Sequence, residues 1–293
     1  MDVQLSLFEN KQRKITNPIK VVNVSSVPQR SPFRFPGGKT WLIPVVRKWL
    51  KQSAGPKKLI EPFTGGGIVS LTTAFEGLAD DVLMVEIDKE IAAVWETIIN
   101  GNYEWLAEMI FSFDLTTENA NRILQKENKT IKEQAFRTIL KNRIFHGGII
   151  AKGAGLIKNG ENGKGIKSRW YPKTLRDRIL AIGHIKKKLK FVTGDAFSEM
   201  EKVKNDTECF SFIDPPYTIA GKRLYTHFEI DHNSLFELTA QLKGKFMLTY
   251  DDTEEIRSLA IKYNLDFRTI PMKTTHHIQK NEIIISDNFG WWK

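Results

Sequence analysis

Hydrophobic and polar positions follow two periods along the chain, one typical of strands and one typical of helices. Short apolar runs bounded by turn residues predict strands at residues 58–61, 82–87, 190–193, 208–213 and 245–250, and near 266–271 and 282–286. Helical spacing predicts helices at residues 39–52, 68–75, 89–100, 174–188, 231–242 and 253–263, with several more between 103 and 145. Because strands that alternate with helices specify a parallel sheet, we expect a doubly wound, Rossmann-like α/β fold.

Residues 103–188 interrupt this alternation as an insert. Their pattern is helical as far as residue 145, and residues 146–171 then hold seven glycines among lysines and asparagines. That composition predicts a long loop or a β-hairpin, so we expect a mainly helical insert with a Gly/Lys-rich hairpin. Residues 1–30 are polar and unpatterned, which predicts a flexible arm. The α/β domain is then expected to consist of residues 31–102 and 189–293.

Composition excludes several classes of protein. The chain has 293 residues and one cysteine, Cys209, which excludes an internal disulfide and a cysteine-rich zinc site. The histidines form no metal-ligand pattern, so no metal is expected. No apolar run reaches the length of a membrane span, and the first 17 residues lack the apolar core of a signal peptide. We therefore expect a cytoplasmic protein with no membrane partner.

The net charge of +10 is concentrated in one stretch, most of which lies in the insert. Residues 151–190 hold twelve Lys and Arg but only two acids, so they account for the whole excess. A run of charge is often only a solvated face, but this one coincides with the glycine-rich segment. It favours a polyanionic partner such as a nucleic acid.

Two glycine motifs precede predicted helices. The turn E-P-F-T-G-G-G at residues 61–67 follows a predicted strand, at the edge of a parallel sheet where ligands bind. Its spacing does not match the dinucleotide fingerprint G-x-G-x-x-G. Upstream, F-P-G-G-K at residues 35–39 is not a P-loop, because Phe33 stands where that motif requires its first glycine. This segment is either a plain turn or a close backbone approach to a ligand.

Acidic residues end two further strands. Glu86 lies 21 residues after Gly65, a position suited to ribose hydroxyls. Asp195 either hydrogen-bonds an adenine amino group or caps the next helix. Acids at the sheet edge suit a nucleoside-containing ligand, whereas features that bind phosphate are lacking. The pattern favours S-adenosylmethionine over a nucleotide.

The tetrapeptide D-P-P-Y, Asp214–Tyr217, ends a strand of aromatic and β-branched residues. Its two prolines hold φ at about −65° and remove two N–H donors. The carboxylate of Asp214 and the carbonyls of Asp214 and Pro215 then form a rigid cluster of acceptors for a substrate amino group. Tyr217 is placed to stack on a planar base. Since phenylalanine would also stack, we expect only a non-aromatic replacement there to be severely damaging.

The order F-P-G-G-K, E-P-F-T-G-G-G, an insert and D-P-P-Y resembles the Dam-type, alpha-group family of DNA adenine-N6 methyltransferases, over about residues 34–285. Residues 281–284 resemble a late family segment less specifically. By this resemblance the catalytic residues are Asp214, Pro215, Pro216 and Tyr217. It places the following residues around S-adenosylmethionine: Phe35, Gly37, Gly38, Lys39, Glu61, Pro62, Phe63, Gly65, Gly67, Glu86, Ile87, Asp195, Ala196 and Asp214. The family often has Trp at the position of Phe35 and Asp at that of Glu86, and both changes keep the chemistry.

The resemblance implies methyl transfer to the N6 amino group of an adenine that is rotated out of duplex DNA. The insert would then recognise DNA, and its candidate contacts are Lys141, Arg143, Lys152, Lys158, Lys164, Lys167 and Arg169. Double-stranded DNA is the expected partner of a monomer or weak dimer. A restriction–modification role with a cognate endonuclease stays open.

Three alternatives also stay open at this point. Cytosine-N4 enzymes usually carry S-P-P-Y, so Asp214 counts against a cytosine substrate. RNA or a protein amide would suit the same chemistry but would not explain the large basic insert. A catalytically silent DNA-binding module of this fold would not need an intact D-P-P-Y and glycine turn.

Overall fold

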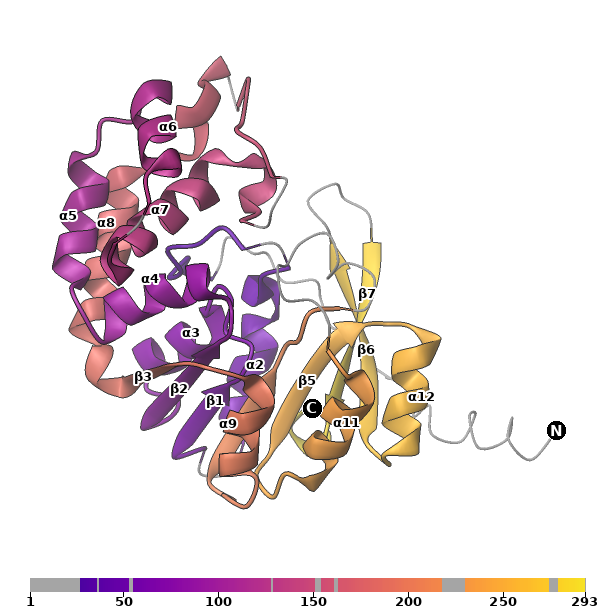
Figure 1. The fold of residues 1–293 in the computed structure, drawn as a ribbon. Helices are drawn as coiled ribbons and strands as arrows, with labels where there is room; N and C mark the ends of the chain where they lie inside the picture. Colours follow the sequence, from indigo (N-terminus) through magenta and orange to yellow (C-terminus); the bar gives the residue numbers. More distant parts are fainter. Residues whose placement is uncertain are drawn as a thin grey trace.

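The computed structural model describes residues 27–35, 37–52, 55–127, 129–150, 154–160, 163–217, 230–273 and 279–292. Within them, one sheet has the strand order β3-β2-β1-β4-β5-β7-β6 (Figure 1). The strands are β1 Lys58–Glu61, β2 Asp81–Glu86, β3 Leu189–Thr193, β4 Cys209–Ile213, β5 Phe246–Asp251, β6 Asp266–Lys273 and β7 Gln279–Ser286. The expected doubly wound α/β fold is confirmed.

The strand order places a switch point between β1 and β4. From β3 to β5 the strands run parallel, as their alternation with helices predicts. β7 pairs antiparallel with both β5 and β6, which the hydrophobic pattern does not reveal. The chain proceeds outward from β1 in one direction and from β4 in the other. Open α/β sheets bind ligands at the carboxyl ends of the strands beside such a reversal.

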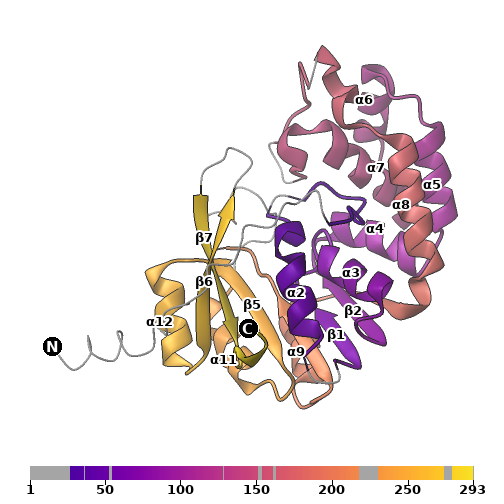
Figure 2. The same cartoon turned by 180° about the vertical axis from the view of Figure 1, so that it is seen from behind.

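Helices cover both faces of the sheet. One face carries α2 Ile43–Leu50, α3 Ile68–Glu76 and α4 Lys89–Ile99, and the other carries α9 Ala196–Val203, α11 His232–Gln241 and α12 Glu254–Lys262 (Figures 1 and 2). In β4, Phe210 and Phe212 pack toward the first layer, whereas Ile213 joins the second. All five residues of β4 are buried, so this strand runs through the dry core and ends immediately before Asp214.

The insert is mainly helical and extends the same core. Its helices are α5 Tyr103–Ser112, α6 Thr117–Gln125, α7 Ile131–Ile144 and α8 Pro172–His184, beside the β3 edge of the sheet (Figure 1). α5 packs on α8, and α7 packs on α4. Leu140 of α7 and Leu175 of α8 share one buried cluster with Trp95 of α4. In the part of the chain that the structure describes, no helix is both long and apolar enough to cross a membrane.

In the described residues the expected hairpin of the insert is reduced to a very short antiparallel pairing. Between α7 and α8 their strand pairing is a single antiparallel bridge, Phe145 to Leu156. The chain otherwise forms 3-10 turns at His146–Gly148 and Gly165–Arg169. Gly163 and Gly165 have φ angles of 70° and 54°, which a regular strand cannot contain. Glycine-rich composition predicted a turn here but could not distinguish a hairpin from a loop.

Residues 27–30 were expected in the flexible arm but are packed against the folded domain. Residues 1–26 lie outside the described part of the chain. Val27 is buried in the main core cluster, and Arg30 pairs with Glu76 of α3 at 3.4 Å. Residues 27–30 therefore belong to the folded domain.

The C-terminal tryptophans cover an edge of the core. Trp291 and Trp292 have ring centroids 5.2 Å apart, and both pack with Phe289 against the main cluster, next to α2. The guanidinium of Arg268 lies 4.9 Å from the ring of Phe289. These contacts give the aromatic tail a structural role.

Candidate active site

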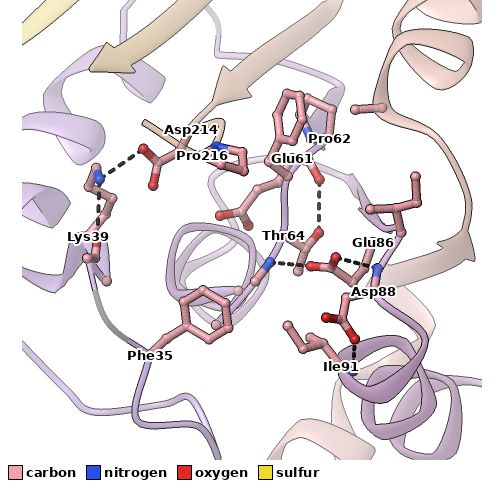
Figure 3. Close-up of a pocket in the computed structure, with 18 of the residues that line it drawn as sticks. Phe35, Lys39, Glu61, Pro62, Thr64, Glu86, Asp88, Ile91, Asp214 and Pro216 are labelled. Carbon is pink, nitrogen blue, oxygen red and sulfur yellow. Dashed lines mark hydrogen bonds and ion pairs between the residues drawn. The ribbon is translucent and has the colours of Figure 1, made fainter. Parts of the chain in front are cut away.

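A cavity of about 570 Å³ opens at the switch point. This size suits a ligand of a few tens of atoms. All fourteen residues expected around the cofactor line it, as does Pro216. The lining also includes residues that were not among the fourteen: Thr64 and Gly66 of the glycine motif, and Ile68, Asp88, Ile91, Gly194, Phe197 and Ile230. Figure 3 shows Lys39 and Asp214 at one side of the cavity and Glu86 and Asp88 at another.

The glycine turn after β1 needs glycine for two separate reasons. Gly65 and Gly67 have φ angles of 46° and 63°, in the left-handed region that favours glycine. A Cβ on Gly65 would lie 2.8 Å from the Phe35 ring. Trp95 of α4 also donates its indole N–H to the carbonyl of Gly65 at 2.9 Å. The turn is therefore held between Phe35 and Trp95.

Glu86 connects the glycine turn to the next helix. One of its carboxylate oxygens accepts the N–H of Gly65 and the other accepts the N–H of Asp88, both at 2.9 Å. Burial raises the pKa of Glu86 to about 7, although these backbone bonds act in the opposite direction. Each oxygen keeps a lone pair beyond its backbone bond, so the carboxylate can still accept a ligand hydroxyl.

Glu61 is the acid at the start of the glycine turn, and it is deeply buried. Its side chain accepts the N–H of Ser70 at 2.9 Å, and the residue is 4% exposed. Burial raises its pKa to about 8, and the nearby carboxylates of Asp214 and Glu86 act in the same direction. The neutral form of Glu61 is therefore favoured up to a higher pH than is usual for a carboxyl group.

Asp214 meets two partners at the end of β4. Its Oδ1 accepts the hydroxyl of Thr249 at 2.7 Å and lies 2.9 Å from the ammonium of Lys39. Lys39 is 3% exposed. Burial alone would lower the pKa of Lys39, but Asp214 and Glu282 outweigh it and the net shift is upward. The catalytic acid expected from the sequence therefore forms an ion pair with a buried lysine.

Tyr217 contributes its hydroxyl as well as its ring. The ring stacks on Tyr250 with centroids 5.7 Å apart. The hydroxyl accepts from Lys39 at 2.8 Å and donates to Glu282 at 3.1 Å. Sequence reasoning treated Tyr217 as a stacking ring alone. A charged residue at the start of the apolar run N-E-I-I-I-S was the available signal for Glu282.

The outer part of the cavity has apolar walls and one helix cap. Ile87 is 45% exposed although it is aliphatic, and it lines the cavity together with Phe197. Asp195 accepts the N–H of Ser198 at 2.9 Å, so it caps α9 while it lines the cavity. Both roles considered for Asp195 are thus compatible with its position. Apolar walls suit the base of a nucleoside, and the polar groups at the edge of the sheet suit its hydroxyl and amino groups.

The basic candidates of the insert fall into two groups. Lys158, Lys164 and Lys167 are exposed and Arg169 is half-buried, whereas Lys152 lies outside the described residues. Lys141 is instead bound to Glu90 of α4. Arg143 is 4% exposed and donates to the carbonyl of Pro32.

The expectation that Arg143 contacts DNA is therefore wrong, whereas a DNA contact by Lys141, whose side chain is 15% exposed, stays a prediction. Lys141 points to Glu90 of α4 and Arg143 to Pro32, so two different sides of α7 are covered by the rest of the protein. Burial lowers the pKa of Arg143 to about 9, and the neighbouring charges of Arg178 and Arg34 add to this effect. A hydrophobic pattern does not reveal which basic residues of a helix are used for internal packing.

Asn142 links the insert to the cavity. Its amide accepts the N–H of Arg34 at 2.8 Å and donates to the carbonyl of Arg34 at 2.9 Å and to that of Gly148 at 2.8 Å. The residue is fully buried. Because Phe35 follows directly, the insert helps to position the segment that covers the glycine turn.

The fold and the site together define a class. A doubly wound sheet has a cavity with acidic and apolar lining residues at its switch point, and the D-P-P-Y segment adjoins that cavity. This is the arrangement of an S-adenosylmethionine-dependent methyltransferase. A sequence profile of the D12 class N6 adenine-specific DNA methyltransferase family matches residues 35–278, and the chain belongs to this family. It is therefore an enzyme that uses S-adenosylmethionine, and DNA is its class of substrate.

Solved structures show weaker likenesses. The provisionally assigned RNA methyltransferase PH1948 of Pyrococcus horikoshii is 12% identical with a TM-score of 0.39, over 97% of this chain and 96% of that one. A SAM-dependent methyltransferase of Agrobacterium tumefaciens is 9% identical with a TM-score of 0.40, over 85% of this chain and 62% of that one. Precorrin-6y C5,15-methyltransferase of Geobacter metallireducens GS-15 is 8% identical with a TM-score of 0.35, over 94% of each chain. No curated protein matches the chain at a significant level.

Proposed function

We propose that this enzyme transfers a methyl group from S-adenosylmethionine to N6 of an adenine rotated out of double-stranded DNA. The observation that carries the proposal is the position of Asp214 and Pro216 on the same cavity as the glycine turn. A cofactor and an amino group can meet there only if the base leaves the stacked duplex. Pairing in the duplex otherwise keeps N6 inside the helix.

The cavity suits the cofactor by the chemistry of its lining. Glu86 offers carboxylate oxygens to ribose hydroxyls, and Ile87 and Phe197 offer apolar contact to a purine ring. The glycines at 65 and 67 bring the backbone close to the ligand. When bound, S-adenosylmethionine supplies an electrophilic methyl group. These assignments extend the family membership to individual residues of this chain.

Asp214 and the neighbouring carbonyls would act on the adenine amino group. The contacts that the described residues make with the Asp214 carboxylate fall on Oδ1, so Oδ2 is the oxygen to face an N–H donor. Two acceptors pull the amino nitrogen toward tetrahedral geometry and make its lone pair available. Catalysis then rests on positioning and on electrostatic stabilisation. The stacked ring of Tyr217 would form a wall for the base.

We assign DNA recognition to the insert, residues 103–188, and catalysis to residues 31–102 and 189–293. Lys158, Lys164 and Lys167 are exposed on the segment between α7 and α8, where phosphates can reach them. In Figure 1, α6 and this segment stand beyond the carboxyl edge of the sheet. DNA bound there would lie over the cavity.

The test is incubation with tritiated S-adenosylmethionine and equal amounts of duplex DNA, single-stranded DNA or RNA. We expect label in adenine of the duplex, and sequencing of the methylated positions then gives the recognition site. A 2-aminopurine in place of the target adenine should increase in fluorescence when the base leaves the stack. Label in cytosine or in RNA would refute the proposal. Cofactor binding by calorimetry without any transfer would indicate a silent DNA-binding module.

A further inference from the structure

A buried cluster of charges lies beneath the D-P-P-Y segment. Its members are Lys39 of the 3-10 turn η2 (Lys39–Leu42), Asp214 after β4, Tyr217 and Glu282 of β7. The side chains of Lys39 and Glu282 are 3% and 5% exposed, whereas that of Asp214 is 20% exposed and lines the cavity. Lys39 and Asp214 both line the cavity, whereas Glu282 does not.

Lys39 is shared between two carboxylates. Its ammonium lies 2.9 Å from Asp214 Oδ1 and 3.8 Å from Glu282 Oε2. It also donates to the Tyr217 hydroxyl at 2.8 Å and to the carbonyl of Gly37 at 3.2 Å. The Tyr217 hydroxyl in turn donates to Glu282. Among the described residues, Lys39 and Tyr217 are the contacts that link Glu282 to the reacting region.

The charges of this cluster bear directly on the proposed reaction. The N6 lone pair forms a bond to the methyl carbon while the carbon–sulfur bond breaks and the sulfur keeps that electron pair. N6 becomes positive and then loses a proton to solvent. A nearby net negative charge stabilises that developing charge. The ammonium of Lys39 opposes this stabilisation, because its positive charge cancels the negative charge of the Asp214 carboxylate.

We propose that Glu282 is a positioning residue of the methyltransferase site, which balances the charge of Lys39 and holds the hydroxyl of Tyr217. With Glu282 ionised, two carboxylates face one ammonium, and Asp214 keeps its strength as an acceptor. With Glu282 neutral, Lys39 is drawn to Asp214 alone. The inference rests on the proposed function, since it concerns the same reaction.

A second consequence of this arrangement is the orientation of the base wall. The Tyr217 ring is fixed on one side by Tyr250 and at its hydroxyl by Lys39 and Glu282. Two attachment points define the plane of the ring more narrowly than stacking alone. Glu282 therefore contributes to both elements that meet the flipped adenine, the acceptor and the stacking surface.

The experiment compares four variants of the full chain: Glu282→Gln, Lys39→Met, the double variant, and Glu76→Gln. Glutamine keeps the shape of Glu282 but removes its charge, and the double variant restores one net negative charge. Glu76 is the matched control, because it is ion-paired with Arg47 at 2.7 Å but does not line the cavity. For each variant, kcat and KM are measured on duplex DNA, the cofactor Kd by calorimetry and Tm by thermal unfolding.

We expect Glu282→Gln to lower kcat by about tenfold or more, with a cofactor Kd within about threefold of the wild-type value. The double variant should have a higher kcat than Glu282→Gln. Glu76→Gln should lower Tm but keep the wild-type kcat. The proposal is overturned if Glu282→Gln turns over like the wild-type enzyme, or if Lys39→Met gives no relief in the double variant. Wild-type turnover in the same assay tests the proposed function separately.

Discussion

Asp214 is positioned by contacts on one of its two carboxylate oxygens. Lys39 and Thr249 both bind Oδ1, which fixes the orientation of the carboxylate before any substrate arrives. Such preorganisation avoids reorientation of the group at the moment of reaction. One oxygen of the Asp214 carboxylate is thus held by the protein, whereas the other is the one proposed to face the substrate.

Asp214→Asn tests this division directly. The amide keeps an acceptor oxygen for Thr249 but loses the negative charge, and its NH2 group can oppose the adenine amino group. We expect kcat to fall by about a thousandfold, while the cofactor Kd changes by less than about tenfold. The measurements are turnover on duplex DNA and calorimetry with the cofactor.

Asp252→Asn is the matched control for that experiment. Asp252 also follows a strand end and is ion-paired, with Arg257 at 2.6 Å, but it does not line the cavity. Its variant should turn over at close to the wild-type rate. Unchanged turnover in Asp214→Asn would remove Asp214 from the catalytic assignment.

Glu61 predicts how the stability of the ligand-free protein depends on pH. Its pKa is raised from the ordinary 4.5 to about 8, mainly by burial, so the folded state retains a proton that the unfolded state has lost. Stability should therefore fall as pH rises from about 5 to 8 and level off above that. Glu86, whose pKa is raised to about 7, contributes in the same direction.

Glu61→Gln should reduce this fall, because glutamine has no proton to lose and keeps an acceptor for Ser70. The measurement is Tm at intervals between pH 5 and pH 8. Glu76→Gln is the control: the pKa of Glu76 is lowered, first by Arg47, so its stabilisation is complete above pH 4.5. That variant should be less stable at every pH with an unchanged slope. Parallel curves for wild type and Glu61→Gln would contradict the buried-acid interpretation.

At the scale of elements, local pattern predicted most of the framework. The strand Lys58–Glu61 has the same limits in sequence and structure, since an apolar pair is bounded by polar residues and followed by a glycine turn. The antiparallel β7 was not predictable, because the direction of a strand depends on the neighbour it meets. Trp95 and Glu282 were missed as site residues for a similar reason: their partners, Gly65 and Tyr217, are distant in sequence.

Two glycines with positive φ angles allow backbone strain to be distinguished from the contact with the Phe35 ring. Gly65 and Gly163 both have positive φ angles, 46° and 70°, so alanine at either costs about 1–2 kcal/mol of strain. At Gly163 nothing lies within 4 Å of the added Cβ, but at Gly65 the Cβ would meet the Phe35 ring at 2.8 Å. Gly65→Ala should lower Tm further than Gly163→Ala does. It should also weaken cofactor binding at least about tenfold by displacing Phe35 into the cavity.

Calorimetry with the cofactor and thermal unfolding on both variants check this expectation. Gly163→Ala isolates the backbone strain, because its surroundings are open. Equal cofactor affinity in the two variants would show that Phe35 moves aside without narrowing the cavity.

At the scale of the molecule, the insert and the α/β domain form one structure with a shared core. Asn142 holds Arg34 and Gly148 together, and Arg143 holds Pro32, so the segment before Phe35 is bound to α7. The charge of the insert could be predicted from sequence, but not its division between internal and external residues. That division depends on which segments pack against each side of α7, here α4 and the segment that contains Pro32. Among the described residues, the exposed lysines of the loop and the half-buried Arg169 are therefore the favoured candidates for DNA contacts.

Two pairs of lysines allow specific DNA contacts by the loop to be distinguished from the effect of the protein's net charge on DNA binding. Lys164 and Lys167 are exposed beside the 3-10 turn Gly165–Arg169. Lys187 and Lys188 are equally exposed, but they directly precede β3 and so lie at the amino edge of the sheet, opposite the cavity. Replacing either pair with glutamine removes the same two charges. We expect only the first replacement to reduce the affinity for duplex DNA strongly.

The salt dependence of binding makes this comparison quantitative. Each phosphate contact contributes about 0.9 to the slope of log K against log salt, so loss of both contacts should reduce the slope by up to about 1.8. Fluorescence anisotropy with labelled duplex between 50 and 200 mM salt, about the range over which counterion release is large, measures it. Lys187→Gln with Lys188→Gln should leave the slope nearly unchanged. If both replacements reduce the slope equally, DNA responds to the overall electrostatic field of the protein and the loop has no specific part in binding. If replacing Lys164 and Lys167 leaves the slope unchanged, the loop is only a solvated surface.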